Sequence, residues 1–321
     1  MEANLSNNSH LNLPTGLSVL ERGWLSSNNI LMHGEASTAL VDSGYCTHAP
    51  QTLALVGAAL GGKPLDVLVN THLHSDHCGG NAALQAAYPA LRTLIPPGHS
   101  AYVRDWDPAR LSYTPTGQQC PRFGFDDVLQ PGTELTLGSQ RWQVHAAPGH
   151  DPHSVMLFEP ASACLLSADA LWQRGFGVVF PELDGDDAFF EVAATLDLIQ
   201  SLVPRVVVPG HGAPFTDVAA ALDFARARLD AFVAAPHKHL THAARVLLKF
   251  KLLDAQHMTR AELLAWAQAT PYLQRLLLRQ QAAATDTQPP KALLEQALGT
   301  VVTDLVRAGA ATLAGDVLHN A

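Results

Sequence analysis

The sequence predicts an α+β fold in which layers of sheet and helix are followed by a helical C-terminal region. Up to about residue 215, short β-type runs alternate with helical segments and are broken by Gly, Pro and Asn. After residue 215 the β-type runs stop, and apolar residues recur at spacings of three and four. We therefore expect a first domain over residues 1–215 and an α-helical region over residues 216–321.

The expected strands are short and rich in Val, Leu and Ile. They cover residues 30–32, 38–41, 67–69, 92–95, 142–145, 155–158, 164–166 and 206–208. Helical composition marks residues 51–60, 81–87 and 187–202, which lie between these strands. In the C-terminal region we expect helices over residues 218–232, 239–253, 260–269, 272–281 and 292–308, with a linker over residues 282–289.

Composition and charge exclude several classes of protein. Hydrophobic residues make up 47% of the 321 residues and charged residues 15%, which excludes a disordered or fibrous chain. The 29 acidic residues outnumber the 20 basic ones, so we expect neither nucleic acid nor a membrane surface as partner. The four cysteines form no CxxC pair and no targeting segment is visible, which predicts free thiols in the cytoplasm.

The strongest chemical pattern is a run of metal-binding side chains that follows the expected strand at residues 67–69. His72, His74, Asp76 and His77 offer four donors within six residues, and imidazole and carboxylate groups are natural ligands of zinc and similar ions. If the backbone stays extended, positions 72, 74 and 76 point in related directions, and His77 points elsewhere. Donors that diverge in this way predict two metal ions.

Three further strands each end in one donor. His150 follows the strand at residues 142–145, Asp169 follows the strand at 164–166, and His211 follows the strand at 206–208. Small residues stand beside each donor and allow close approach of the backbone. These three residues are therefore candidates to complete the metal site.

With these residues the sequence resembles the metallo-β-lactamase superfamily, whose pattern is HxHxDH followed by a later His, an Asp and a final His. The similarity covers about residues 12–215, and every position of the pattern is filled. The resemblance implies an αββα sandwich with the site at one edge of its two sheets. It also implies one metal held by His72, His74 and His150, and a second held by Asp76, His77 and His211, with Asp169 bridging.

The metal pair implied by this resemblance predicts a hydrolase of ester-like bonds. Two cations about 3.5–4 Å apart create metal-bound hydroxide near neutral pH, and one of them polarises the substrate carbonyl. Asp76 is expected to orient the hydroxide and to receive its proton. The ions are expected to be zinc, with iron or manganese as alternatives. Asp42 is expected to support the site without binding a metal.

The residues around Asp169 favour a thioesterase among the hydrolases of this superfamily. Asp169-Ala170-Leu171-Trp172 resembles the glyoxalase II pattern, whereas acyl-homoserine lactonases often carry Tyr where this chain has Trp172. The indole N–H of Trp172 can donate a hydrogen bond but cannot serve as a proton source. A lactonase or phosphodiesterase on the same scaffold remains an alternative. A non-catalytic ligand-binding regulator is less favoured, because all seven metal positions are filled.

The substrate is expected to be a small molecule. An apolar wall for its acyl group is expected from Phe176 and Phe180, with Trp172 beside the site and His153 at the rim of the pocket. The C-terminal helices are expected to form a lid or wall over the site, with contacts in a homodimer as a second possibility.

Overall fold

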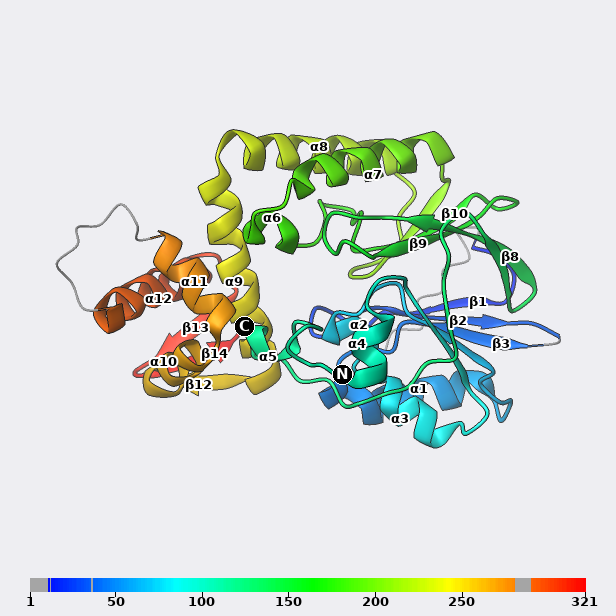
Figure 1. The fold of residues 1–321 in the computed structure, drawn as a ribbon, viewed down its shortest axis with the longest axis horizontal. Coiled ribbons are helices and arrows are strands. Elements are labelled where there is room, and N and C mark those ends of the chain that lie inside the picture. Colours follow the sequence, from blue (N-terminus) through cyan, green and yellow to red (C-terminus); the bar gives the residue numbers. More distant parts are fainter. Residues whose placement is uncertain (1–10, 12, 36, 281–289) are drawn as a thin grey trace. The chain divides into compact units, whose positions relative to one another are not determined.

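The computed structural model describes residues 11, 13–35, 37–280 and 290–321 (Figure 1). The chain divides into two compact units. The first consists of the described residues of Met1–Leu111 together with Gln119–Asp230, and the second consists of Ser112–Gln118 with the described residues of Ala231–Ala321. The second long stretch of the first unit ends at Asp230, and a short stretch from the middle of the chain is part of the second unit.

Six strands form the first sheet, in the order β1-β2-β3-β4-β5-β6. The first three strands pair antiparallel, and β3, β4, β5 and β6 pair parallel. Their bounds are Leu17–Leu20, Asn29–His33, Thr38–Val41, Val67–Val69, Arg92–Ile95 and Asp127–Val128. The parallel arrangement places the carboxyl ends of β3 and β4 side by side, next to the first donor run.

Five strands form the second sheet, in the order β11-β10-β9-β8-β7. All neighbours pair antiparallel except β10 and β11, which are parallel. In chain order from β7 to β11, the bounds are Glu134–Leu137, Gln140–Ala146, Val155–Glu159, Cys164–Ala168 and Val206–Pro209. The segments that carry His150, Asp169 and His211 leave this sheet after β8, β10 and β11.

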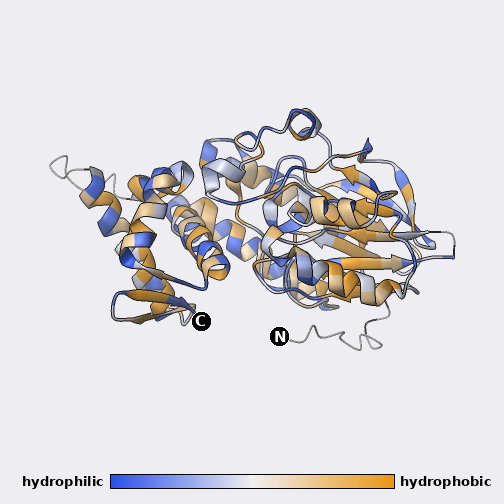
Figure 2. Cartoon of the chain, turned by 90° about the horizontal axis from the view of Figure 1, so that it is seen from below, coloured by the Kyte–Doolittle hydropathy of each residue, from blue (hydrophilic) through white to orange (hydrophobic). Residues whose placement is uncertain are grey.

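The core lies between the two sheets because alternate residues of each strand face it. Ile30 and Met32 of β2 pack in the same cluster as Val144 and Leu157 of the second sheet. Leu31, between them in the sequence, packs on the opposite face of the first sheet among residues of α1 (Ala49–Leu60) and α3 (Asn81–Ala87). Figure 2 shows the strands of both sheets coloured mainly as hydrophobic.

Helices cover the outer faces of the two sheets, so the αββα layering is confirmed (Figure 1). Helix α7 (Ala188–Leu202) and α8 (Val218–Ala234) lie on the side of the second sheet, opposite α1 and α3. Glu182 supports the start of α7, since its carboxylate accepts a hydrogen bond from the N–H of Phe189 at 3.0 Å. The described part of this unit also contains α2 (Ser75–Cys78), α4 (Ser100–Asp105), α6 (Phe180–Asp184) and a short 3-10 helix over Cys46–His48.

The second unit contains the last four of the expected C-terminal helices and, in addition, a small sheet that the sequence reading missed. Its helices are α5 (Tyr113–Thr116), α9 (Pro236–Ala255), α10 (Arg260–Ala269), α11 (Pro271–Gln280) and α12 (Pro290–Arg307). Three strands, β12 (His257–Thr259), β13 (Ala311–Ala314) and β14 (Val317–Asn320), pair in the order β12-β14-β13. The expectation that strands stop after residue 215 is therefore wrong, and the expected linker over 282–289 lies outside the described residues.

Local sequence explains two features of this second unit. Helix α10 begins with a capping box, in which Thr259 Oγ1 accepts from the N–H of Glu262 and the Glu262 carboxylate accepts from the N–H of Thr259. Strands β13 and β14 are joined by Gly315 and Asp316, and Gly315 has a φ of +61°. This two-residue Gly-Asp loop is a hairpin signal that could have revealed the sheet.

None of the helices within the described residues is both long enough and apolar enough to cross a membrane. All four cysteines are free thiols, with Cys78 and Cys164 buried.

The core between the sheets yields a prediction on stability. Leu157 of β9 is fully buried, so Leu157→Ala leaves a cavity and should lower the free energy of unfolding by about 2–5 kcal/mol. Phe190 of α7 is 71% exposed, and Phe190→Ala should change this free energy by less than about 0.5 kcal/mol. Urea unfolding followed by circular dichroism measures both. Equal effects of the two substitutions would contradict this assignment of the core.

Candidate metal centre

Three imidazoles form the first group of candidate ligands. His72 follows β4, His74 precedes α2, and His150 lies in the loop that follows β8. One ligand atom from each lies within 4.8 Å of the others. Nδ1 of His74 and Nε2 of His150 are only 2.8 Å apart. The three rings thus converge on one point, as ligands of a single cation do.

Two carboxylates and two imidazoles form the second group. Asp76 and His77 lie on α2, while Asp169 and His211 come from the segments after β10 and β11. Their ligand atoms also lie within 4.8 Å of one another. The Oδ2 atom of Asp169 is 3.5 Å from His77 Nε2 and 3.4 Å from His150 Nε2. Asp169 therefore faces both groups.

The expected extended backbone over positions 72 to 76 is wrong. The chain becomes helical at Ser75, so Asp76 lies with His77 in the second group and not beside His72 and His74. The change occurs because α2 begins immediately after His74, whose own backbone is extended. One short run thereby supplies donors to both groups.

Hydrogen bonds from the far nitrogen of three rings fix how these rings are oriented. His77 Nδ1 lies 2.8 Å from Asp42 Oδ2, His150 Nδ1 lies 2.5 Å from the carbonyl of Val178, and His211 Nδ1 lies 3.0 Å from the carbonyl of Gly23. Because these oxygens only accept, each Nδ1 carries the proton and donates it. The three Nε2 atoms are then available as ligands, as in most metal sites built from histidine.

Asp42 forms hydrogen bonds with other parts of the site besides His77. Its carboxylate also accepts hydrogen bonds from the backbone N–H of Thr71 at 2.9 Å and from Thr71 Oγ1 at 2.8 Å. Asp42 is 2% exposed and lies at the end of β3 with a φ of +59°. It thus joins the ends of β3 and β4 to the ring of His77, the supporting position expected from the sequence.

Two buried nitrogen atoms show that the donors fit a metal. The Nε2 atoms of His72 and His77 are buried and have no hydrogen-bond partner among the described residues. An unpaired buried polar atom costs about 1–3 kcal/mol, so such atoms usually face a ligand or an ion. Both Nε2 atoms lie among carboxylate and imidazole groups of the two candidate ligand groups. Divalent cations such as zinc bind both types of ligand.

The protonation states of the first group favour cation binding. Burial, followed by the influence of His150, lowers the pKa of His74 to about 4. Burial and the neighbouring His77 and His74 rings also lower the pKa of His72 well below its ordinary value. Both rings are therefore neutral near pH 7 and keep a lone pair for a metal.

The second group has a different balance of charge. Burial acts to lower the pKa of His77, but Asp169, Asp42 and Asp76 together raise it well above its ordinary value. Burial acts to raise the pKa of Asp169, but His77 and His211 lower it well below its ordinary value. Without a metal, His77 thus carries a proton beside an ionised Asp169. This proton must leave before His77 Nε2 can bind a cation.

Glycines allow the donor loops to approach one another. A methyl group at Gly210 would overlap the carboxylate of Asp169, and a methyl group at Gly177 would overlap the ring of His150. Neither position can hold a larger residue without a shift of the site.

Solvent reaches one donor in each group. The side chains of His74 and Asp76 are each 16% exposed, whereas those of Asp169 and His211 are 5% and 3% exposed. The partly exposed pair lies on one short segment, which marks the face from which a substrate can enter.

Of the residues expected to bind substrate, Trp172 and Phe180 lie against the donors. Trp172 Nε1 donates a hydrogen bond to Asp169 Oδ1 at 3.1 Å. The Phe180 ring lies 5.4 Å from the His74 ring and 5.8 Å from the His150 ring, centroid to centroid.

The other two residues expected at the pocket have different surroundings. Phe176 is 1% exposed, with the guanidinium of Arg228 placed 5.6 Å from its ring centroid, so an acyl group could reach it only by displacing packed side chains. His153 is in neither donor group, and its ring lies 4.6 Å from that of His99. Their part in binding substrate remains a prediction.

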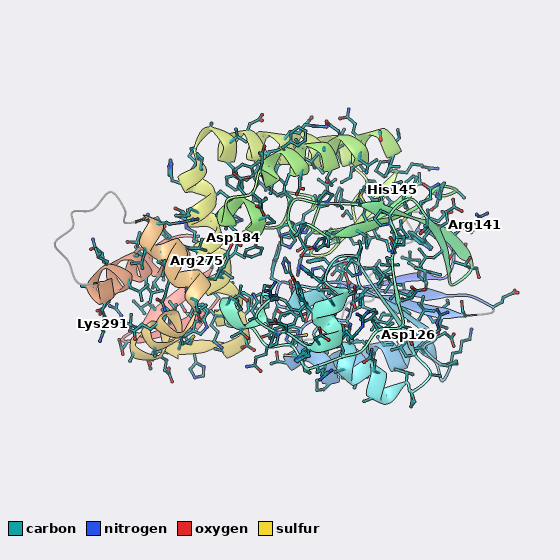
Figure 3. The ribbon with its side chains drawn as sticks, viewed as in Figure 1. Asp126, Arg141, His145, Asp184, Arg275 and Lys291 are labelled. Carbon is teal, nitrogen blue, oxygen red and sulfur yellow. The ribbon has the colours of Figure 1, made fainter. Side chains whose placement is uncertain are left out.

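Two residues beside the donors were not anticipated from the sequence. Trp24 stacks on the ring of His211, with centroids 5.4 Å apart and an angle of 10° between the planes. Asp151 Oδ2 lies 3.9 Å from His74 Nε2. Asp151 could have been suspected because it directly follows His150, but no spacing pattern links Trp24 to any donor. His145 belongs to neither group. It lies on β8 (Figure 3), and its ring centroid is 6.5 Å from that of Phe158.

Comparisons with known proteins agree with this geometry. The family model of the metallo-beta-lactamase superfamily matches residues 22–211, which include all seven donors. A hydroxyacylglutathione hydrolase from Brucella anthropi is 29% identical over 189 residues, which are 58% of this chain and 58% of that protein. One from Anaeromyxobacter dehalogenans is 35% identical over 147 residues, which are 46% of this chain and 47% of that protein. The chain thus matches about half the length of these relatives.

Solved structures of other proteins have a fold similar to that of this chain. A metallo-beta-lactamase family protein from Thermus thermophilus has a TM-score of 0.55 and 19% identity, covering 96% of this chain and 99% of that chain. A second protein, solved in a di-iron-bound form, has a TM-score of 0.52 and 27% identity, covering 64% of this chain and 98% of that chain. The first likeness concerns the fold alone, and it extends over the second unit as well.

The bond between Asp42 and His77 yields a prediction on metal affinity. Asp42→Asn keeps the size of the side chain and tolerates the positive φ, but a neutral amide holds the His77 ring less firmly. We expect the affinity of the second group for zinc to fall about 10–100-fold. Competition with a chromophoric chelator measures it. Unchanged affinity for both ions would show that Asp42 has no part in holding the site.

Proposed function

Because the chain belongs to the metallo-beta-lactamase superfamily, we propose that it is a dinuclear metal-dependent hydrolase that cleaves a thioester bond. The observation that carries this proposal is the pair of donor groups that share Asp169. Further support comes from the relatives named hydroxyacylglutathione hydrolase, since a hydroxyacylglutathione is a thioester. The reaction adds water across the bond, so that the oxygen joins the acyl carbon and the thiol leaves with a proton.

We assign the metal ligands as the two groups suggest. The first ion would be held by His72, His74 and His150, the second by Asp76, His77 and His211, with Asp169 between them. When bound, the two ions would polarise the acyl carbonyl and supply hydroxide near neutral pH. Imidazole and carboxylate donors suit zinc, and they also accept iron or manganese.

Asp76 is proposed as the catalytic carboxylate. It is the donor of the second group that solvent reaches, and its Oδ2 lies 3.1 Å from His211 Nε2. Burial acts to raise the pKa of Asp76, but His77 and His211 lower it below its ordinary value, so the carboxylate is ionised at neutral pH. An ionised carboxylate at the entry face can orient the attacking water and accept its proton.

Trp172 is proposed to position Asp169 and not to move a proton. Its indole N–H is used in the bond to Asp169 Oδ1, which leaves Oδ2 of that carboxylate directed at His77 and His150. An indole has no acidic proton to give to a leaving group. A thiolate leaves without such help more readily than an alkoxide, and this favours a thioester over a lactone.

The proposal also covers the class of substrate, the cellular compartment and the binding partners. We propose a small-molecule substrate and a cytoplasmic enzyme with no nucleic-acid or membrane partner. The acidic net charge of −9 and the free thiols support this. A homodimer also remains a prediction, and light scattering would test it.

A substrate panel tests the proposed reaction. Metal-loaded protein would be assayed on acyl thioesters, lactones and a phosphodiester, with His74→Ala as the inactive control. Hydrolysis of thioesters that is lost in His74→Ala is the expected result. A preference for lactones or the phosphodiester would replace the thioesterase assignment, and no turnover with two metals bound would contradict all three.

Removal of the Asp76 carboxylate should abolish most of the activity. Asp76→Asn should lower kcat on a thioester about 100-fold or more, because an amide cannot accept the proton of water. Asp223→Asn, on the exposed surface of α8, is the matched control and should keep wild-type kcat. Steady-state kinetics, with metal content measured on the same samples, gives the answer. Full activity of Asp76→Asn with two metals bound would remove Asp76 from the mechanism.

A further inference from the structure

An exposed tryptophan lies beside the candidate metal centre and packs in neither core cluster of the first unit. Trp24 is 55% exposed and is absent from the clusters on both faces of the first sheet. It comes from the loop between β1 and β2, and the carbonyl of the preceding Gly23 accepts the hydrogen bond from His211 Nδ1. Large aromatic side chains left exposed at a site commonly serve binding.

Trp24 and Trp172 together form an aromatic corner over His211. Their ring centroids lie 5.2 Å apart with an angle of 72° between the planes. Trp24 is stacked on the His211 ring, while Trp172 meets that ring edge-on, with centroids 5.7 Å apart and an angle of 82°. The corner therefore adjoins the second donor group, and Trp172 also contacts Asp169.

The corner suits a flat ring better than a flexible chain. Aromatic rings prefer offset-stacked or edge-to-face contacts. One face of Trp24 is covered by His211, so a planar acyl group would stack on the exposed side of this indole, where Trp172, inclined at 72°, offers an edge-to-face contact. A saturated ring of the same size would bury similar area but would gain neither contact.

The two arginines nearest to this corner in the sequence are engaged elsewhere, and the charged group that Trp172 contacts is the Asp169 carboxylate. The guanidinium of Arg22 donates to Asn29 Oδ1, Thr52 Oγ1 and Gln51 Oε1. The guanidinium of Arg174 lies 5.2 Å from the ring centroid of Phe224. The aromatic character of the corner, with these arginines held away, favours a neutral acyl group.

We propose that Trp24 and Trp172 bind the acyl group of the substrate, and that the substrates are thioesters of aromatic acids. This inference rests on the proposed function for the type of bond that is cleaved. The binding of an aromatic group at Trp24 and Trp172 does not depend on that function. Binding of an aromatic acid can be measured without catalysis, so the two can fail separately.

The kinetic test compares phenylacetyl and cyclohexylacetyl thioesters of N-acetylcysteamine, which differ only in the flatness of the ring. We expect wild-type kcat/KM to be about tenfold higher for the phenylacetyl compound. Trp24→Ala should bring this ratio close to one, and Trp24→Phe should keep most of it. Phe190→Ala, which removes an exposed aromatic ring from α7, should leave the ratio at its wild-type value.

The binding test uses metal-free protein, so that it does not depend on turnover. Calorimetric titration should show phenylacetate binding several-fold more tightly than cyclohexylacetate, and Trp24→Ala should remove this difference. Tryptophan-dependent binding of phenylacetate with no thioester hydrolysis would overturn the proposed function and leave this inference standing. Equal binding of the two acids by wild-type protein, or a preference that Trp24→Ala leaves intact, would overturn the inference.

Discussion

The convergence of buried imidazole and carboxylate groups at one edge of the two sheets is the constraint on which the rest of this structure depends. Ring nitrogens of His74 and His150 face each other at 2.8 Å, and the Nε2 atoms of His72 and His77 have no hydrogen-bond partner among the described residues. Such an arrangement is unfavourable by itself, since buried polar atoms are left unpaired. A cation would satisfy these nitrogens, with loss of the proton of His77, and the fold must hold the rings in place for it.

The scaffold meets this requirement with hydrogen bonds between the rings and the surrounding protein. Asp42 at the end of β3 and the carbonyls of Val178 and Gly23 each accept a hydrogen bond from one ring. These acceptors come from three distant parts of the first unit, so the site depends on the complete packing of its two sheets. Gly177 and Gly210 let the loops approach closely enough. Trp172 then fixes Asp169 between the two groups.

Much of the fold and of the donor set could be predicted from the sequence. The strands at residues 38–41, 67–69 and 92–95 were placed at their observed bounds, because each is a short run of β-forming residues bordered by polar or turn residues. The first four donors were recognisable by their spacing, and the other three because each follows the end of a strand and fits the pattern of the family that the sequence resembles. What the pattern could not give was local backbone geometry, so the helical turn at Ser75 was missed.

Features that depend on contacts between distant segments were beyond the sequence. Trp24 was missed because its partners Trp172 and His211 are far along the chain and no periodicity connects them. Strands β12 and β14 pair across about sixty residues of mostly helical sequence, and only the Gly315-Asp316 loop between β13 and β14 was a local signal of this sheet. Phe176 looked like an accessible wall because composition does not tell a buried aromatic residue from an exposed one.

The most direct measurement is the number of metal ions bound per chain, counted by plasma mass spectrometry after equilibrium dialysis against zinc. Wild-type protein should bind two ions. His72→Ala and His211→Ala should each keep one, because each substitution removes a ligand from only one of the two groups. A single ion in wild-type protein, or the loss of all metal from both variants, would contradict a site built from two donor groups that share Asp169.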